Sequence, residues 1–180
     1  DMIMNKQDRF NTPSLLTLNR QFRDFMTLQY VALHSLAPEQ QYFIKRRSMA
    51  ELKKHRNCCD PILGIYGTDG TLLAQGILGK PGVSPYATGY PISGDANLIA
   101  LVQSVSVHPE HVGQGLVAQI LAALSVQAAI NGQTLLMAKI AAANTPSLKA
   151  FERFGFQVMR QAQCPQNGQA YCYLRKPVFG

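Results

Sequence analysis

The sequence predicts an α/β (α+β) protein in which helices flank a mixed central sheet. Segments with strand-like and helix-like patterns alternate along the 180 residues, which is typical of such folds. Apolar residues make up 47% of the chain and charged residues 15%, so the chain can bury a core and is not disordered. No domain boundary is visible, so we expect one domain over residues 1–180, with its core at about 15–176.

The first third of the chain is predicted to be mainly helical. A short strand at 14–18 precedes a helix at 20–36, in which apolar residues recur near helical spacing. Pro38 favours the start of a second helix, which we expect to continue to about His55.

The middle of the chain is predicted to form a hairpin, a loop and a central strand. Residues 61–66 and 71–78 pair across a turn at 67–70. The segment 79–96 is rich in Gly, Pro, Ser and Tyr, and a loop of this length is a candidate wall of a substrate site. Residues 97–107 form a long apolar strand suited to the centre of a sheet.

The last part alternates again between helix and strand. A glycine-bearing turn leads into a helix at 116–130, and residues 134–140 form the next strand. Asn144 caps a short helix that ends at Gly155. Residues 156–161 and 169–175 are expected to form a final strand pair.

The net charge of +7 has solubility as its simpler interpretation and an anionic ligand or partner as its more specific one. Six basic residues crowd one stretch and only Glu51 opposes them. They are Lys45, Arg46, Arg47, Lys53, Lys54 and Arg56. A solvated helix face is the simpler interpretation and nucleic-acid binding the other, for which no aromatic residues or motif give support.

Several classes of protein are not expected. No apolar run reaches the about 18 residues of a membrane span, and polar residues at 5–9 argue against a secretory signal. The four cysteines show no CxxC pair and no metal-ligand spacing to histidine. We therefore expect a cytoplasmic protein with reduced thiols, no metal and no membrane partner.

The turn before the helix at 116–130 carries the clearest chemical signal. Gly113 and Gly115 let a ligand approach the backbone closely because they have no Cβ. The helix start adds unpaired N–H groups and the positive end of its dipole, which suits a pyrophosphate. No Gly-Lys-Ser/Thr follows and no third glycine is present, so neither a Walker motif nor a dinucleotide fingerprint is formed.

Two motifs resemble those of the GNAT superfamily of N-acetyltransferases. Residues 105–117, VSVHPEHVGQGLV, look like its acyl-coenzyme A signature. Residues 144–156, NTPSLKAFERFGF, resemble its second motif, with Asn144, Ser147, Phe151 and the Gly155-Phe156 pair in the expected places. The order of elements agrees from about residue 15 to 175, so the resemblance covers nearly the whole chain.

The resemblance implies that the strands at 97–107 and 134–140 are parallel and splay apart, with coenzyme A in the gap. Backbone groups of Val105 and Val107 would bind the pantetheine amides. Asn144 would bind near the pantetheine, and Phe151 would pack against the pantetheine or in the core. Lys149 or Arg153 would meet a cofactor phosphate, with an ordinary exposed helix face as the alternative for both. The pyrophosphate would lie on N–H groups of the turn and helix start, from Val112, Gly113, Gln114, Gly115, Leu116 and Val117.

The sequence departs from the family pattern at three places. Val112 and Val117 stand where the family prefers Gln or Arg and a small residue, which we expect to weaken cofactor binding. Phe151 stands where many members have a Tyr that protonates the leaving thiolate, and a phenyl ring cannot act as an acid. Gln103 and Ser104 stand where many members have a Glu on the central strand.

The catalytic acid and base are therefore not identified from the sequence. Substitutes could come from four tyrosines in the long loop and on the last strand, although packing is the simpler interpretation of each. They are Tyr86, Tyr90, Tyr171 and Tyr173. Cys164 and Cys172 have no visible His partner and are not favoured as nucleophiles.

We expect an N-acetyltransferase that transfers an acetyl group from acetyl-coenzyme A to a primary amine by direct attack in a ternary complex. The acceptor would be a small molecule or a peptide, and nucleic acid is a less favoured partner. The alternative is a catalytically silent acyl-coenzyme A-binding or regulatory module. The sequence leaves the acceptor, the acyl chain and the oligomeric state open, a homodimer included.

Overall fold

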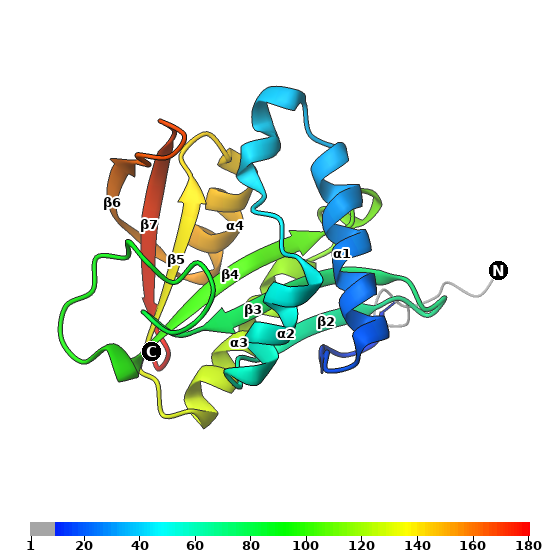
Figure 1. Cartoon of the computed structure of the whole chain (residues 1–180), viewed down its shortest axis with the longest axis horizontal. Helices are drawn as coiled ribbons and strands as arrows, with labels where there is room; N and C mark the ends of the chain where they lie inside the picture. The colour runs from blue at the N-terminus through cyan, green and yellow to red at the C-terminus, as the bar shows by residue number, and fades with distance from the viewer. Residues whose placement is uncertain (1–9) are drawn as a thin grey trace.

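A seven-stranded mixed sheet forms the centre of the computed structural model, which describes residues 10–180 (Figure 1). The strand order is β1-β2-β3-β4-β5-β7-β6. Only β4 and β5 are parallel, and every other neighbouring pair is antiparallel. The strands are β1 (Ser14–Leu15), β2 (Ile62–Tyr66), β3 (Leu72–Gly79), β4 (Ile99–Val107), β5 (Leu135–Ala141), β6 (Gln157–Gln163) and β7 (Ala170–Pro177). The predicted fold class is confirmed.

Helices cover both faces of this sheet. The α-helices are α1 (Asn19–His34), α2 (Met49–Asn57), α3 (Leu116–Ile130) and α4 (Thr145–Phe154), and the 3-10 turns are η2 (Pro38–Phe43), η3 (Ala96–Leu98) and η4 (Pro109–His111). One face packs on α1 and α2 through a core that includes Phe22, Phe25 and Leu52. The other face packs on α3 and α4 through a larger core that includes Ile120 and Phe151.

The expected single helix from Pro38 to about His55 is wrong. The chain forms the short turn η2, then an extended strap (residues 44–48), and only then α2. The strap does not close into a helix because the side-chain amide of Gln29 in α1 binds the Arg47 backbone. Ser48 then starts α2 as its N-cap, with its hydroxyl accepting the N–H of Glu51 at 3.1 Å.

Other predicted elements agree closely with the structure. The helix at 116–130 has the predicted bounds, and most strands differ by one or two residues at their ends. The first strand is shorter than predicted, because only Ser14 and Leu15 pair with β2.

The loop between β3 and β4 packs onto the sheet along much of its length. Ser84 and Ala87 are buried, and Tyr90 and Ile92 pack against Leu101 and its neighbours on β4 and β5. The buried part of the loop therefore lies against β4 and β5 on the α1 side of the sheet, and its role as a wall of a substrate site stays a prediction.

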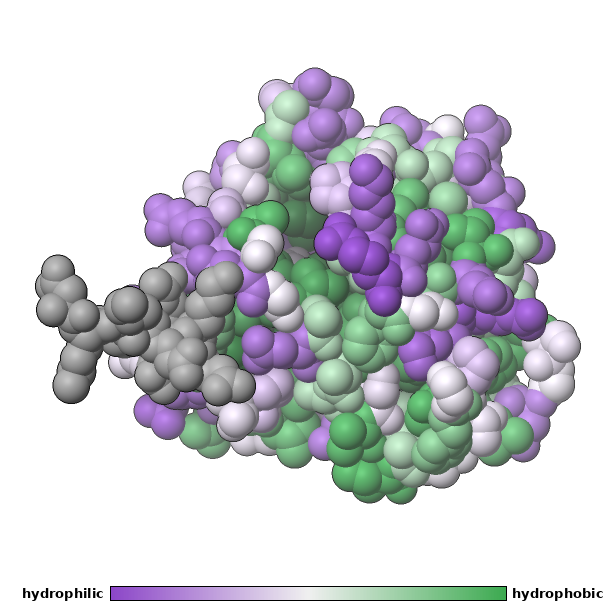
Figure 2. Space-filling model, turned by 180° about the vertical axis from the view of Figure 1, so that it is seen from behind, coloured by the Kyte–Doolittle hydropathy of each residue, from purple (hydrophilic) through white to green (hydrophobic). Residues whose placement is uncertain are grey.

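The face covered by α3 and α4 exposes apolar surface between hydrophilic side chains (Figure 2). On α3, Val126 and Ile130 are 57% and 70% exposed. This helix is therefore apolar well beyond the stripe that faces the core.

No helix within residues 10–180 is long and apolar enough to cross a membrane. The polar stretch at 5–9, on which the expectation of no secretory signal rests, lies outside the described residues.

Candidate functional site

The two parallel strands separate halfway along their length. Their pairing runs from Ile99 with Leu135 to Val102 with Ala138 and ends there. Beyond that point β4 continues to Val107, paired only with β3, and β5 continues to Ala141, paired only with β7. Backbone groups on the facing edges of β4 and β5 are thus without a strand partner, which suits an extended ligand with amide groups.

A bulge in β4 lies at the start of this gap. The register with β3 shifts between the Gln75–Ser106 and Ile77–Gln103 pairs, so β4 holds one extra residue there. Ser104 adopts the left-handed conformation with φ of 54°, which is uncommon for a residue other than glycine. The bulge turns the Ser104 side chain toward the strap, where its hydroxyl accepts a hydrogen bond from Arg47 Nε at 2.7 Å.

The end of β4 leads through η4 into the predicted glycine turn and α3. Gly113 and Gly115 have φ of 81° and 78°, and a Cβ built on either would have no atom within 4 Å. No side chain caps α3, and N–H groups from 112 to 118 take part in none of the turn, loop or cap hydrogen bonds of residues 10–180. An open cradle of N–H groups at a helix N-terminus fits a phosphate group.

The two valines that depart from the family pattern do not fill this cradle. Val112 is 70% exposed. Val117 is partly buried and packs against the larger core. Leu116, whose N–H is part of the same cradle, anchors the first turn of α3 with a side chain that is 2% exposed. The structure therefore gives no steric reason for either valine to block a phosphate.

The second predicted motif forms the entry to α4. Asn144 follows β5 and is the N-cap of α4, with its side-chain oxygen accepting the N–H of Ser147 at 3.4 Å. Val105 and Val107 are half-buried on the facing part of β4 and pack against the larger core. Lys149 and Arg153 lie on the exposed side of α4. The motif thus stands at the end of β5 that borders the gap.

Phe151 is a core residue. Its side chain is 3% exposed, and its ring lies 5.1 Å from the Phe156 ring, centroid to centroid. This position explains why an aromatic residue stands there even without a hydroxyl group. Its predicted contact with the pantetheine stays a prediction.

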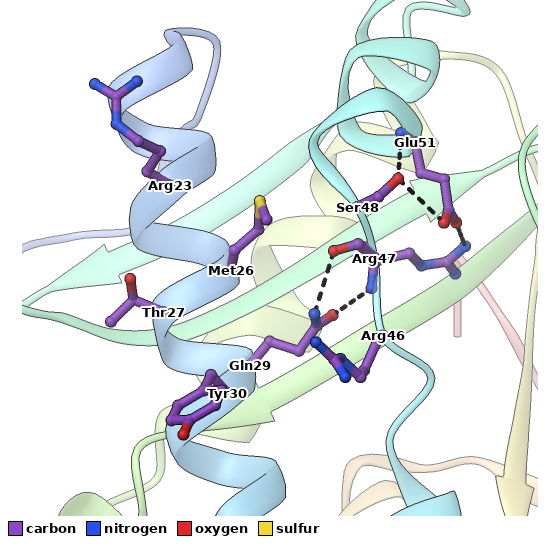
Figure 3. A pocket seen from close by; sticks show the side chains of 9 residues that line it. All are labelled: Arg23, Met26, Thr27, Gln29, Tyr30, Arg46, Arg47, Ser48 and Glu51. Carbon is purple, nitrogen blue, oxygen red and sulfur yellow. Dashed lines mark hydrogen bonds and ion pairs between the residues drawn. The ribbon is translucent and has the colours of Figure 1, made fainter.

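The strap closes the α1 side of the gap and holds a buried arginine. Arg47 is 4% exposed, and desolvation by burial lowers its pKa to about 10. Besides Ser104, it donates to the Pro85 carbonyl at 3.4 Å and lies 3.8 Å from a Glu51 carboxylate oxygen. Figure 3 shows Arg47 and Arg46 on opposite sides of the strap, with Arg46 beside α1.

This position corrects the interpretation of residues 45–56 as one solvated helix face. Lys45, Arg46, Lys54 and Arg56 are exposed, whereas Arg47 is buried between the strap, the loop and β4. The basic residues therefore do not form one continuous surface.

An open groove lies between α1 and the strap. It has a volume of about 770 Å³ and is lined by residues such as Arg23, Met26 and Tyr30 of α1 and Arg46 of the strap (Figure 3). Gln29 forms its inner wall by joining α1 to the strap. The groove is thus separated from the Ser104 bulge by the Arg47 backbone.

Tyrosines and lysines line the α1 side of the gap. Lys139 of β5 lies with its Nζ 4.5 Å from the centre of the Tyr171 ring of β7. Tyr171 in turn contacts Tyr42 of η2, with ring centroids 6.3 Å apart. Tyr173 packs edge-on against Tyr90 of the long loop at 5.7 Å. Desolvation by burial raises the pKa of Tyr90 to about 12, so this phenol remains protonated at neutral pH.

The central strand carries no carboxylate at the gap, as expected from Gln103 and Ser104. Gln103 is 5% exposed and donates its side-chain N–H to the Tyr86 carbonyl at 3.3 Å. The carboxylate that reaches this region is Glu51, at the start of α2. Glu51, Lys139 and Tyr42 were not among the residues predicted from the sequence, because only the fold brings them to this side of the sheet. η2 packs on β5 and contacts Tyr171 of β7, whereas the strap lies on β4.

The two cysteines considered as nucleophiles do not form a catalytic pair. Cys164 and Cys172 are free thiols, and the hydrogen bonds of their sulfur atoms within residues 10–180 go to Gln166 and Gln161 and not to a histidine. No group of three or more His, Cys, Asp or Glu side chains suited to a metal ion occurs among residues 10–180.

Comparison with known proteins agrees with this geometry. The model of the FR47-like protein family matches residues 96–164, the segment from η3 through β4, α3 and α4 to the end of β6. This stretch contains both motifs and the gap between β4 and β5. No curated protein matches the sequence.

Solved structures of acetyltransferases share the fold. The chain is similar to yncA from Salmonella typhimurium, solved with its cofactor acetyl-CoA, with 19% identity over 94% of each chain and a TM-score of 0.68. It is similar to the ribosomal-protein-S18-alanine N-acetyltransferase from Escherichia coli, with 15% identity over 93% of each chain and a TM-score of 0.67. Nourseothricin acetyltransferase is matched over 66% of this chain and 65% of its own, with 21% identity and a TM-score of 0.55.

The fold is that of the GNAT acetyltransferases. Together with the FR47-like match, it confirms the resemblance that the two sequence motifs indicated.

Proposed function

We propose that the protein is an N-acetyltransferase that uses acetyl-coenzyme A to acetylate a primary amine. The observation that carries the proposal is the loss of β4–β5 pairing after Val102 and Ala138 directly beside an uncapped helix start. A gap with free backbone edges suits the pantetheine, and the cradle at Gly113 and Gly115 suits the pyrophosphate. The acetyltransferase fold of the similar structures supports the same donor.

The chain's own residues would hold the donor as the motifs predict. Val105 and Val107 would offer backbone groups to the pantetheine amides, and Asn144 would close the end of the gap. A backbone N–H of β4 could polarise the thioester carbonyl, as an oxyanion donor does. The thioester supplies the acetyl group, so the amine nitrogen forms the amide bond while the carbon–sulfur bond breaks and coenzyme A leaves.

Proton removal from the acceptor would not need a glutamate on the central strand. Lys45, Arg47 and Lys139 place positive charge on the α1 side of the gap, and nearby positive charge lowers the pKa of an ammonium group. A larger share of the acceptor is then a neutral, nucleophilic amine at a given pH. Glu51 is the carboxylate placed to receive the proton, directly or through water.

The fold does not identify the acceptor molecule. The similar structures carry names with different acceptors, such as nourseothricin and an alanine of a ribosomal protein. For this chain we propose an amine of a small molecule or a peptide.

The proposal is tested by calorimetric titration with acetyl-coenzyme A and coenzyme A at moderate and high salt, followed by a thiol-release assay on a panel of amines. Micromolar binding with release of thiol that depends on an amine supports it. A folded protein that binds neither compound contradicts it.

A catalytically silent acyl-coenzyme A-binding module is the second candidate. It is favoured by Phe151, which has no hydroxyl and is buried, and by the absence of a carboxylate on the central strand. Micromolar coenzyme A binding without turnover of any amine would support this module and exclude the transferase.

A further inference from the structure

Two lysines on the α1 side of the gap have aromatic partners but no carboxylate partner. Lys45 Nζ lies 4.0 Å from the centre of the Tyr86 ring, and Lys139 Nζ lies 4.5 Å from that of Tyr171. Within residues 10–180, no ion pair involves either ammonium group. A cation–π contact leaves most N–H donors of a lysine free, so both ammonium groups can bind an anion.

These two lysines lie on neighbouring elements although they are far apart in the sequence. η2, which precedes Lys45, packs on β5, and its Tyr42 contacts Tyr171, whose ring centre lies 4.5 Å from Lys139 Nζ. Both lysines also act on Cys164 in the β6–β7 turn. The pKa of this thiol is lowered first by the Gln166 backbone N–H and further by the charges of Lys139 and Lys45.

The other charged groups here are mostly positive. Arg47 lies 4.1 Å from the centre of the Tyr86 ring and Arg160 lies 5.5 Å from that of Tyr173. Glu51 is the carboxylate in ionic contact with this group, and it pairs with Arg47 at 3.8 Å. The charge of Arg47 is thus partly balanced, whereas those of Lys45 and Lys139 are not.

We propose, on the basis of the function proposed above, that the acceptor amine also carries a carboxylate, which Lys45 and Lys139 bind. The carboxylate would be held on the α1 side of the gap while the amine points to the thioester. Arg47 is a positioning residue, because it fixes Tyr86 and the Ser104 bulge between these groups. A polyamine would be repelled from this site. A free amino acid and the carboxylate of a peptide present the same chemistry.

The first test compares acceptors that differ only in the carboxylate. Amino acids, the same amino acids with a C-terminal amide, and short peptides with free or amidated C-termini are assayed with saturating acetyl-coenzyme A. We expect kcat/KM to be at least about tenfold higher for the carboxylate forms, as a charge-assisted contact can supply. Comparing the amino acids with the peptides shows whether the carboxylate belongs to a free amino acid or to the C-terminus of a peptide. Equal or faster turnover of the amidated acceptors overturns the proposal.

Matched variants assign the preference to these lysines. Lys45→Gln and Lys139→Gln should each remove most of the carboxylate preference through KM and leave the Kd of coenzyme A unchanged. Arg46→Gln is the control, because it removes the same charge one residue away. Arg46 lies on the opposite side of the strap from Arg47 (Figure 3), and Arg47 shares the Tyr86 ring with Lys45. A preference that survives in both lysine variants, or that is equally lost in Arg46→Gln, contradicts the assignment.

The second test measures the electrostatic potential at Cys164 and does not depend on enzymatic turnover. Thiols are alkylated with iodoacetate or iodoacetamide, and the modification of each cysteine is followed by mass spectrometry. Lys45→Gln and Lys139→Gln should lower the ratio of iodoacetate to iodoacetamide rates at Cys164 at low salt, because the anionic reagent is attracted by the lysines. The ratio at the exposed Cys59 is the internal control, and an unchanged ratio at Cys164 contradicts the proposal.

The two tests separate this inference from the proposed function. If the protein does not bind coenzyme A, the transferase proposal fails whatever the alkylation rates are. If it binds coenzyme A and acetylates amines without a carboxylate preference, only the inference about the acceptor fails.

Discussion

Gly115 combines an open position with a backbone conformation that favours glycine. Its φ of 78° costs about 1–2 kcal/mol for other residues, and no atom lies within 4 Å of a Cβ built there. We expect Gly115→Val to weaken coenzyme A binding at least about tenfold, or about 1.4 kcal/mol, because the side chain would occupy the phosphate cradle. Isothermal titration measures the Kd.

Gly132 provides the matched control for this variant. It follows the other end of α3, has φ of 72° and is equally open. Gly132→Val should therefore show the same loss of stability as Gly115→Val but bind coenzyme A like the unmodified protein. If the two variants bind coenzyme A with equal affinity, the pyrophosphate does not bind at the Gly115 turn.

Phe151 lies in the core, at the position where many members of the family that the motifs resemble have a tyrosine that protonates the thiolate. Phe151→Tyr should raise turnover if protonation of the thiolate limits the rate and the hydroxyl reaches the gap. A hydroxyl that remains buried without a partner should instead lower the free energy of unfolding by about 1–3 kcal/mol. Urea unfolding and steady-state kinetics on the same variant separate the two outcomes. A rise in turnover requires that the free energy of unfolding is nearly unchanged, because the hydroxyl then has a partner in the gap.

At the scale of elements, the strap between η2 and α2 depends on one buried side chain of α1. Gln29 accepts the Arg47 N–H at 2.7 Å and donates to the Arg47 carbonyl at 3.2 Å. Gln29→Leu removes both bonds and should lower the free energy of unfolding by about 1–3 kcal/mol for each backbone group left unpaired. It should also raise the KM of the acceptor, because Arg47 and Lys45 lose their position.

Gln40→Leu is the control for the strap, because Gln40 is an exposed residue of η2. Urea unfolding gives the free energy of unfolding, which should fall only in Gln29→Leu. A titration gives the Kd of coenzyme A, and this Kd should be the same in both variants. A Gln29→Leu protein with unchanged stability and acceptor KM would show that the strap is held by other contacts.

The strap is also the segment whose secondary structure the sequence predicted wrongly. The apolar positions between Pro38 and His55 fit a helical period, and they predicted one helix. The competing interaction comes from Gln29, nine residues before Pro38 along the chain, and no local pattern identifies it. In contrast, α3 has its predicted bounds, because a glycine turn and Asn131-Gly132 mark both ends locally.

At the scale of the whole molecule, ligand binding should stabilise the fold. The proposed site draws on β4, β5, α3 and α4, so unfolding removes it completely. At 100 times the Kd, coenzyme A adds about 2.7 kcal/mol, which corresponds to a rise in Tm of roughly 5–11 °C for a chain of this size. Differential scanning fluorimetry measures the rise, Gly115→Val should reduce it, and an unchanged Tm at saturating ligand would contradict the proposed donor site.

The sequence by itself determined the α/β class and, apart from the segment between α1 and β2, the order of the elements. It also determined the half of the candidate site made by β4, the glycine turn and the entry to α4. These features follow from short-range signals: apolar period, positive-φ glycines and helix caps act within a few residues of the chain. The resemblance to the GNAT superfamily rested on the same segments, and the chain shares the fold of solved GNAT structures.

Only the tertiary structure decided the acceptor side. Lys45, Glu51, Lys139 and Tyr171 come from four separate elements. They lie on the same side of the sheet because the strap crosses β4 and η2 packs on β5 and contacts Tyr171. The burial of Arg47 follows from the same crossing, since its guanidinium reaches Ser104 on a strand 57 residues later in the chain. The physical reason is that desolvation and charge pairing depend on which side chains become neighbours in space, and the spacing of residues along the chain does not contain that information.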